Sequence, residues 1–158
     1  MKAINEISEN SNYTAVNIGK INNLDIHSFI HPKNGQKVTG KVFLKEATKA
    51  TGTEISFQTL PAKTELPYFH KHEQNEETYI VLSGFGFFQV DDDCFPVEEG
   101  SVVRISPPAK RGFCNTSDKS MILIVIQSCQ NSLEQYSSDD GERVNAEPKW
   151  RDNCTSAT

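Results

Sequence analysis

Alternation of polar and apolar residues dominates the middle of the chain. Glu54–Leu60 alternates residue by residue, which is typical of a strand with one buried face. Further short candidates follow at intervals of about 8 to 12 residues: Tyr68–His72, Glu77–Ser83, Phe85–Val90, Cys94–Val97, Ser101–Ile105, Gly112–Asn115 and Met121–Gln127. Turn residues such as Ser83-Gly84 and Pro107-Pro108 separate them. Many short strands at this spacing predict an all-β protein, either an antiparallel sandwich or a barrel.

The two ends of the chain are more polar than this central part. Residues 1–45 hold two strand candidates, Asp25–His31 and Lys41–Glu46, and we interpret them as an N-terminal extension that supplies edge strands. The first 20 or so residues show no clear period and are expected to be an extended lead-in. Residues 46–130 form the predicted barrel, and 131–158 a C-terminal tail. We expect Trp150 to dock this tail on the barrel or on a partner subunit, because an exposed indole forfeits a large hydrophobic gain.

Composition limits the size and the partners of the protein. The chain has 158 residues, enough for one ordinary domain. Lys and Arg number 16 against 21 Asp and Glu, a net charge of −5 that argues against a nucleic-acid partner. No apolar run is long enough for a signal peptide or a membrane span, so we expect a cytoplasmic protein with no membrane partner. The four cysteines form no Cys-x-x-Cys pair and are expected to be free thiols.

One segment carries the chemistry. His70 and His72 are two residues apart, so on a strand their imidazoles lie on one face, about 6.5 Å apart. Glu77 follows after four residues and begins the next strand candidate. Two imidazoles and one carboxylate make a facial triad suited to Fe, Mn, Ni or Zn with open coordination positions. Tyr79 shares the face of Glu77 and should line the pocket, whereas the competing carboxylate, Glu76, points to the opposite face.

The same residues permit a site without metal. Two inward imidazoles can hydrogen-bond to Glu77 and ordered water, or bind the carboxylate or hydroxyl of a ligand. The residue pattern leaves both interpretations open.

This segment resembles the first motif of the cupin superfamily, His-x-His, four residues, Glu, six residues, Gly. His70, His72, Glu77 and Gly84 match its four positions, while Thr64 stands where the family has a leading glycine. The stretch from Gly100 to Asn115 resembles the second motif in its glycine, proline and asparagine. The resemblance implies a double-stranded β-helix, a small jelly-roll barrel. It also implies that the second motif lacks its histidine, the usual fourth metal ligand, because Gly112 takes that place.

The missing histidine raises the question of a substitute. Cys114 lies two residues beyond Gly112, on the same strand face, and its thiolate can reach a metal. The alternative interpretation is that Cys114 is a small buried hydrophobic residue. His27 and His31 can approach from an N-terminal strand or lie on the surface. Arg111, near the predicted pocket mouth, is a candidate clamp for a substrate carboxylate, and Tyr79 a candidate proton donor.

The resemblance permits two classes of function. In the first, a divalent metal on His70, His72 and Glu77 acts on or binds a small metabolite bearing a carboxylate or hydroxyl, with dioxygenase, isomerase, decarboxylase or lyase chemistry. In the second, a metal-free pocket binds or senses a sugar or small acid without turnover. Small cupins also pair through N-terminal strands, so we expect a homodimer.

Overall fold

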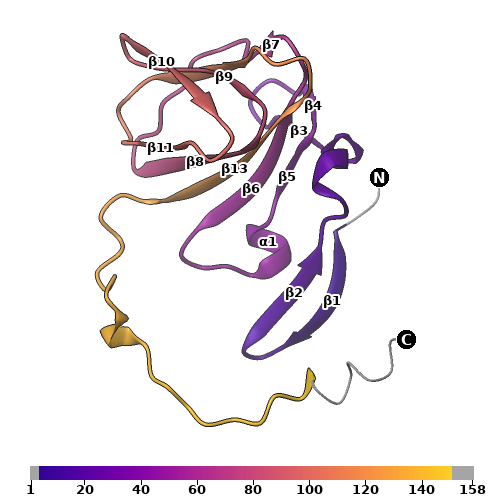
Figure 1. Cartoon of the computed structure of the whole chain (residues 1–158), viewed down its shortest axis with the longest axis vertical. Coiled ribbons are helices and arrows are strands. Elements are labelled where there is room, and N and C mark those ends of the chain that lie inside the picture. The colour runs from indigo at the N-terminus through magenta and orange to yellow at the C-terminus, as the bar shows by residue number, and fades with distance from the viewer. Residues whose placement is uncertain (1–3, 151–158) are drawn as a thin grey trace.

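Two antiparallel sheets face each other and enclose the interior of a barrel (Figure 1). The computed structural model describes residues 4–150. The larger sheet has the strand order β11-β8-β13-β6-β5, formed by β11 (Val102–Ile105), β8 (Asn75–Ser83), β13 (Met121–Cys129), β6 (Glu54–Leu60) and β5 (Lys41–Phe43). The smaller sheet has the order β10-β9-β12-β7, formed by β10 (Asp93–Glu98), β9 (Phe85–Val90), β12 (Arg111–Asn115) and β7 (Thr64–Glu65). The all-β prediction is confirmed. Apart from β5–β6 and β9–β10, consecutive barrel strands lie in opposite sheets, as in a jelly roll.

Most of the predicted barrel strands are present. β6 and β9 have the predicted bounds, and the others differ by one or two residues at an end. The exception is Tyr68–His72, which is not a strand: its one ladder contact is an isolated bridge between His70 and Arg111. The segment runs beside β12, where the Leu66 N–H donates to the Phe113 carbonyl, but Pro67 has no N–H to continue the ladder from there to His70.

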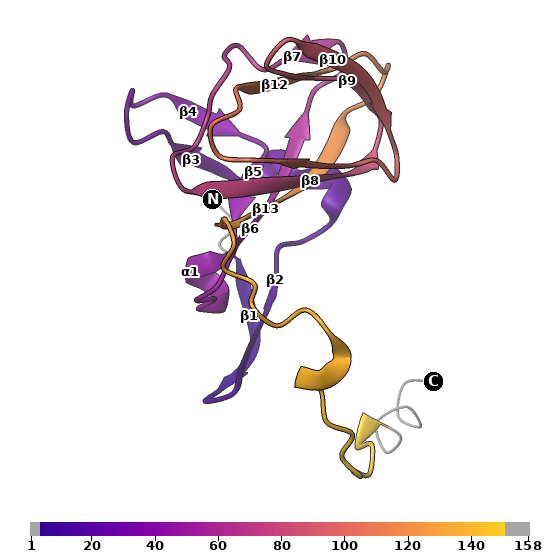
Figure 2. The same ribbon diagram turned by 90° about the vertical axis from the view of Figure 1, so that its left-hand side faces the viewer.

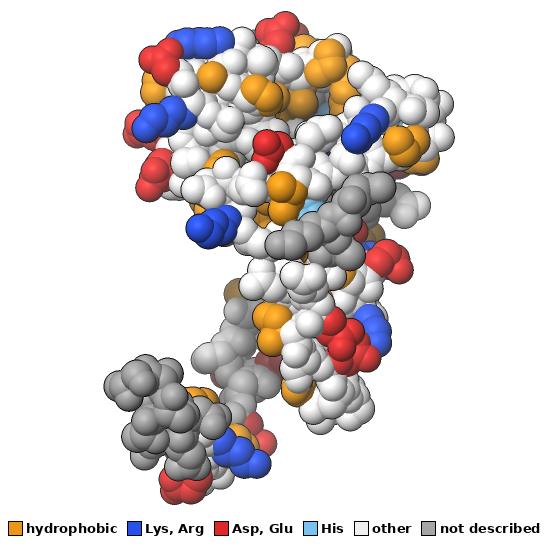
Figure 3. Space-filling model, turned by 90° about the vertical axis from the view of Figure 1, so that its right-hand side faces the viewer, with side chains coloured by type: hydrophobic (Ala, Val, Ile, Leu, Met, Phe, Trp, Pro, Cys, Tyr) orange, Lys and Arg blue, Asp and Glu red, His pale blue; other side chains and the backbone are white. Residues whose placement is uncertain are grey.

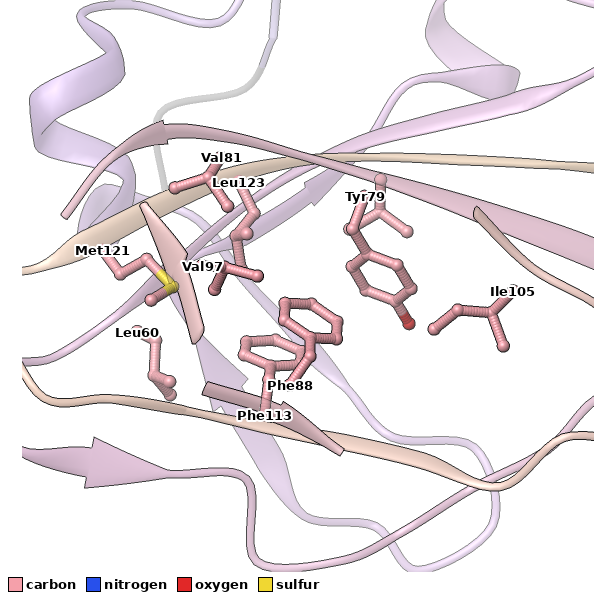
Figure 4. Packing of buried hydrophobic residues seen from close by; sticks show 10 residues of the cluster. Leu60, Tyr79, Val81, Phe88, Val97, Ile105, Phe113, Met121 and Leu123 are labelled. Carbon is pink, nitrogen blue, oxygen red and sulfur yellow. The ribbon is translucent and has the colours of Figure 1, made fainter. Parts of the chain in front are cut away.

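The inner faces of the two sheets bury an apolar core (Figure 4). Phe88 and Phe113 stack with ring centroids 4.8 Å apart, and the Tyr79 ring meets both edge-on. The aliphatic part of the core comes mainly from the larger sheet, and its members include Leu60, Val81, Leu123 and Val125. Inward residues recur at every second position of each strand, as the alternation in the sequence predicts.

Part of the N-terminal region belongs to the barrel. The 3₁₀ segment η1 (Ile21–Ile26) covers the outer face of the larger sheet, where Leu24, Val42 and Ile122 form a second apolar cluster. The hairpin of β3 (Ser28–Ile30) and β4 (Lys37–Thr39) follows, and β5 then pairs with β6 as the edge strand of the larger sheet. The short helix α1 (Lys45–Thr48) replaces the end of the predicted strand Lys41–Glu46.

The first residues form a hairpin that projects from the barrel (Figures 1 and 2). β1 (Asn5–Asn10) pairs with β2 (Tyr13–Asn17), so the prediction of an extended lead-in is wrong. β1 has no apolar period because every one of its residues is exposed, and neither face needs apolar side chains. The turn is fixed locally, with the backbone N–H of Asn12 donating to Asn10 Oδ1 over 2.8 Å.

The C-terminal tail runs away from the barrel (Figures 1 and 2). Within residues 131–150 only Pro148 is partly buried, and η2 (Ser138–Asp140) forms a short helical turn. Trp150 is 70% exposed, so the expectation that it docks on the barrel is wrong for the described chain. The large apolar side chains that precede it in the tail, Leu133, Tyr136 and Val144, are exposed as well, so none of them packs the tail against the barrel. Residues 151–158, including Cys154, lie outside the described range.

No helix within residues 4–150 is long and apolar enough to cross a bilayer.

Candidate metal centre

A row of polar side chains crosses the inner face of the larger sheet at one end of the apolar core. Glu77 on β8 is opposite Gln127 on β13, and Gln127 is in turn opposite Glu54 on β6. Two residues further along the strands, the corresponding row contains Tyr79, Val125 and Ser56. The pattern of alternation therefore places Glu77 inside the barrel, where it is only 6% exposed.

His70 and His72 lie over this polar row. Backbone hydrogen bonds hold their segment: His70 exchanges two with Arg111, and the His72 N–H donates to the Pro107 carbonyl. His72 Nε2 is 3.1 Å from Glu77 Oε1, and His70 Nε2 is 3.5 Å from Glu77 Oε2. The three side chains each offer a ligand atom, and these atoms all lie within 4.8 Å of one another. The structure thus brings together the three residues that the sequence singled out.

Glu77 is an ionised carboxylate with strong partners. Tyr79 Oη donates to its Oε2 over 2.6 Å, and Arg111 donates to the same oxygen from Nη2 over 2.8 Å and from Nε over 3.1 Å. Burial alone would raise the pKa of Glu77. Hydrogen bonds from His70 and Tyr79, with the charges of His72 and Arg111, outweigh this and hold that pKa well below its usual range. Burial and the Glu77 charge raise the pKa of Tyr79, so Tyr79 keeps its proton.

His72 is held in a form that can bind a metal. Its partial burial lowers its pKa, opposed by the nearby charge of Glu77, so the neutral imidazole is favoured near pH 7. Gln127 Nε2 lies 3.1 Å from His72 Nδ1 and 3.2 Å from His72 Nε2, and these contacts restrict the orientation of the ring. His70 Nδ1 is the one buried side-chain polar atom among residues 4–150 that lacks a hydrogen-bond partner.

A cavity of about 240 Å³ opens beside these residues. The residues that line it include His70, Glu77 and Tyr79, together with Lys41, Gln58 and Tyr68. This volume lies below the usual range of drug-sized pockets, so the cavity suits a small metabolite.

Comparison with known proteins gives the family. The family model described as "Cupin domain" matches residues 56–127. A solved cupin protein from Bacteroides fragilis is 37% identical to this chain, with a TM-score of 0.64, and the match covers 72% of this chain and 99% of that one. The chain is a cupin.

Two more distant structures share the fold of this cupin. A predicted oxalate decarboxylase from Thermotoga maritima is 21% identical, with a TM-score of 0.54, over 65% of this chain and 90% of that one. An uncharacterised Klebsiella pneumoniae protein with a double-stranded β-helix domain is 14% identical, with a TM-score of 0.52, over 73% and 91%. No curated protein matches this cupin.

Arg111, and not Gly112, faces the histidines from β12. Gly112 was predicted at the place of the second-motif histidine, but in the cupin barrel it lies on the outer face of β12, against the Phe69 ring. The Arg111 side chain points inward and is fully buried. A shift of one residue along a strand exchanges its two faces. The position that faces the histidines from β12 therefore carries the guanidinium of Arg111 and not the bare backbone of a glycine.

Cys114 lies outside the site for the same reason. Cys114 shares the outer face with Gly112, in a surface hollow that Phe69 and Phe87 also line, so it does not complete the metal centre. Arg111, the candidate clamp for a substrate carboxylate, is fully buried and donates hydrogen bonds to Glu77 and to the Ala109 carbonyl.

The remaining alternatives also lie elsewhere. His27 is buried, and its Nε2 is 2.8 Å from the Ile18 carbonyl oxygen. Glu76 points to the outer face as expected, and accepts a hydrogen bond there from Arg104 Nε over 2.8 Å.

The donor set of this cupin fits a divalent metal with three protein ligands. Tyr79 and Arg111 occupy Glu77 Oε2, which leaves Oε1, next to His72 Nε2, as the carboxylate donor. Neutral imidazole and carboxylate ligands suit Zn, Fe, Mn and Ni. Arg111 introduces a fixed positive charge near the centre, and this should weaken the affinity relative to a site without it.

Two residues near the site, Gln127 and Lys41, had no functional signal in the sequence. Gln127 ends a predicted strand, and nothing in the alternation indicated a partner for His72. Lys41 belongs to a region interpreted as an extension, and only the pairing of β5 with β6 brings it to the cavity.

Proposed function

We propose that this cupin holds a divalent metal on His70, His72 and Glu77 and binds, or acts on, a small metabolite in the adjoining cavity. The observation that carries the proposal is the convergence of three metal-binding atoms within 4.8 Å of one another, from residues of which His70 and Glu77 line the cavity. A metal held there would supply Lewis-acid or oxygen-activating chemistry to a carboxylate- or hydroxyl-bearing ligand.

The chain's own residues prepare the site for this role. Arg111 and Tyr79 keep Glu77 ionised and fix its rotamer, while Gln127 orients His72. Tyr79 donates a hydrogen bond to Glu77, so in this geometry it positions the carboxylate and is not free to protonate a substrate. No further acid or base is needed for a binding role.

A metal-free pocket is the second candidate, and one observation favours it. Arg111 already gives Glu77 the positive charge that a metal would otherwise supply. In that case the imidazoles of His70 and His72 would hydrogen-bond directly to a sugar or small acid, and the protein would act as a binding or sensing module.

Elemental analysis of untagged protein separates the two candidates. The comparison uses wild type, His72→Ala and the matched control His31→Ala, which removes a histidine from outside the metal centre. We expect metal near one equivalent in wild type and in His31→Ala, and a loss of most of it in His72→Ala.

Either of two results would reject the metal proposal. One is equal metal content in all three proteins, which would mean adventitious binding. The other is no uptake by wild type after incubation with Fe(II), Mn(II), Ni(II) or Zn(II), which would leave the metal-free pocket.

We also infer a cytoplasmic homodimer with neither nucleic acid nor membrane as partner. The projecting β1–β2 hairpin supports the dimer. A two-stranded hairpin needs further packing for stability, and besides its contact with α1 this one leaves Ile7 66% exposed. The surface supports the lack of a polyanionic partner: on the face shown in Figure 3, basic side chains are scattered among acidic ones and form no large patch. Sedimentation of wild type and Ile7→Asp tests the dimer, which the variant should weaken.

A further inference from the structure

A lysine enters the cavity from the edge of the larger sheet. Gly40 turns the chain between β4 and β5 with a φ of +83°, and the methyl group of Thr59 fills the space that a side chain at Gly40 would need. Lys41 follows at once, opposite Gln58, and both side chains line the cavity. His70 and Glu77 line the same cavity.

Lys41 has no counter-ion in the described chain. Among residues 4–150, its ammonium makes no ion pair. It lies 5.0 Å from the centroid of the Phe43 ring, a contact that compensates only part of the loss of hydration. Burial lowers the pKa of Lys41, and the charges of Glu77 and Glu54 oppose that shift without cancelling it. A partly desolvated cation without a partner is costly, and an anionic ligand would remove this cost.

The other cavity walls describe the rest of the ligand. Apolar side chains line it on several sides: Phe29, Val38, Leu66, Pro67 and Phe113. A second cation, Lys37, also lines the cavity and is exposed at the surface. The cavity therefore combines positive charge with apolar walls, and a small organic acid has the matching chemistry.

We propose that Lys41 binds the carboxylate of a small organic acid, whose apolar body occupies the cavity beside His70 and Glu77. This deepens the proposed function and rests on it for the identity of the binding cavity, but it does not need the metal. It assigns ligand recognition to β5, a strand outside both cupin motifs.

The test compares acids with their own neutral amides. The probes are benzoate with benzamide and butyrate with butyramide, measured by thermal shift and titration calorimetry. The proteins are wild type, Lys41→Met, Lys41→Arg and the matched control Lys45→Met, which removes an exposed lysine from α1. Each acid and amide pair differs in charge but little in shape.

We expect at least one acid to stabilise wild type and Lys45→Met, while its amide does not. Lys41→Met should bind that acid about tenfold or more weakly, since it loses a charged hydrogen bond, and Lys41→Arg should recover part of the affinity. Without ligand, Lys41→Met should melt no lower than wild type, because the isosteric methionine fills the same space without a desolvated charge.

Several results would overturn the proposal. They are that no acid stabilises wild type more than its amide, that Lys41→Met binds the acid as wild type does, or that Lys41→Met melts lower than wild type without ligand. Elemental analysis of the same proteins keeps this inference apart from the metal proposal. If the metal content depends on His72 while Lys41→Met leaves acid binding unchanged, only the carboxylate-binding role of Lys41 is rejected. If acid binding depends on Lys41 but the protein holds no metal, only the proposed metal site is rejected.

Discussion

Two consecutive glutamates on β8 are each bound by an arginine, one outside the barrel and one inside. Glu76 pairs with Arg104 on the outer face, where the side chains are 27% and 49% exposed. Glu77 pairs with Arg111 on the inner face, where the side chains are 8% and 0% exposed. The residue types are the same, and only burial differs.

Burial changes what such a pair does. Water and salt screen the outer pair, so its loss should matter little to stability. The inner pair is desolvated, and each charge there depends on the other. The inner arginine therefore has two effects: it makes a buried carboxylate tolerable, and it sets that carboxylate's orientation beside the two histidines.

Removal of each arginine is the strongest test of this difference. Arg111→Met leaves Glu77 buried without its main cation and should lower the free energy of unfolding by about 3–5 kcal/mol. Arg104→Met, the matched control on the outer face, should cost about 1 kcal/mol or less. Urea unfolding of both variants in the presence of chelator measures the two values. Similar losses in the two variants would contradict the distinction.

The histidines of the site could be predicted from the sequence because their signal is local. His70, His72 and Glu77 form one short motif, and the alternation in β8 chose Glu77 over Glu76 for the inner face. The barrel strands were predicted for the same reason, since each buries one face and repeats with period two.

The partners of that motif were harder to predict. The second motif was interpreted with Gly112 at the inward position that Arg111 occupies. An error of one residue is enough to exchange the inner and outer faces of a strand. Lys41 and Gln127 reach the site only through strand pairing between distant parts of the chain. The β1–β2 hairpin lacks apolar alternation on either face, so no periodic signal exists for it.

Added metal should partly restore the stability of Arg111→Met, an effect smaller than the loss caused by the substitution. If a divalent metal binds Glu77, it can replace the positive charge that Arg111→Met removes. Zn(II) or Mn(II) should then raise the melting temperature of Arg111→Met more than that of wild type, and should leave Arg104→Met like wild type. Thermal shift with and without metal gives this ranking. An Arg111→Met protein that responds to metal no more than wild type would argue against a metal at Glu77.

Acid should weaken the metal-free protein through the inner site, with the smallest effect of the three. The pKa values of His72 and Glu77 are both lowered by folding, from ordinary values of 6.5 and 4.5. Below each ordinary value the unfolded chain takes up a proton that the folded protein does not, so stability falls as the pH falls. The decline should begin below about pH 6.5 through His72 and steepen below about pH 4.5 through Glu77. Urea unfolding of chelated protein between pH 7 and 4 measures it. Glu77→Gln should lose the steeper part of the decline, because its amide cannot titrate. If the free energy of unfolding of Glu77→Gln instead falls in parallel with that of wild type below pH 4.5, the buried carboxylate is not the group responsible.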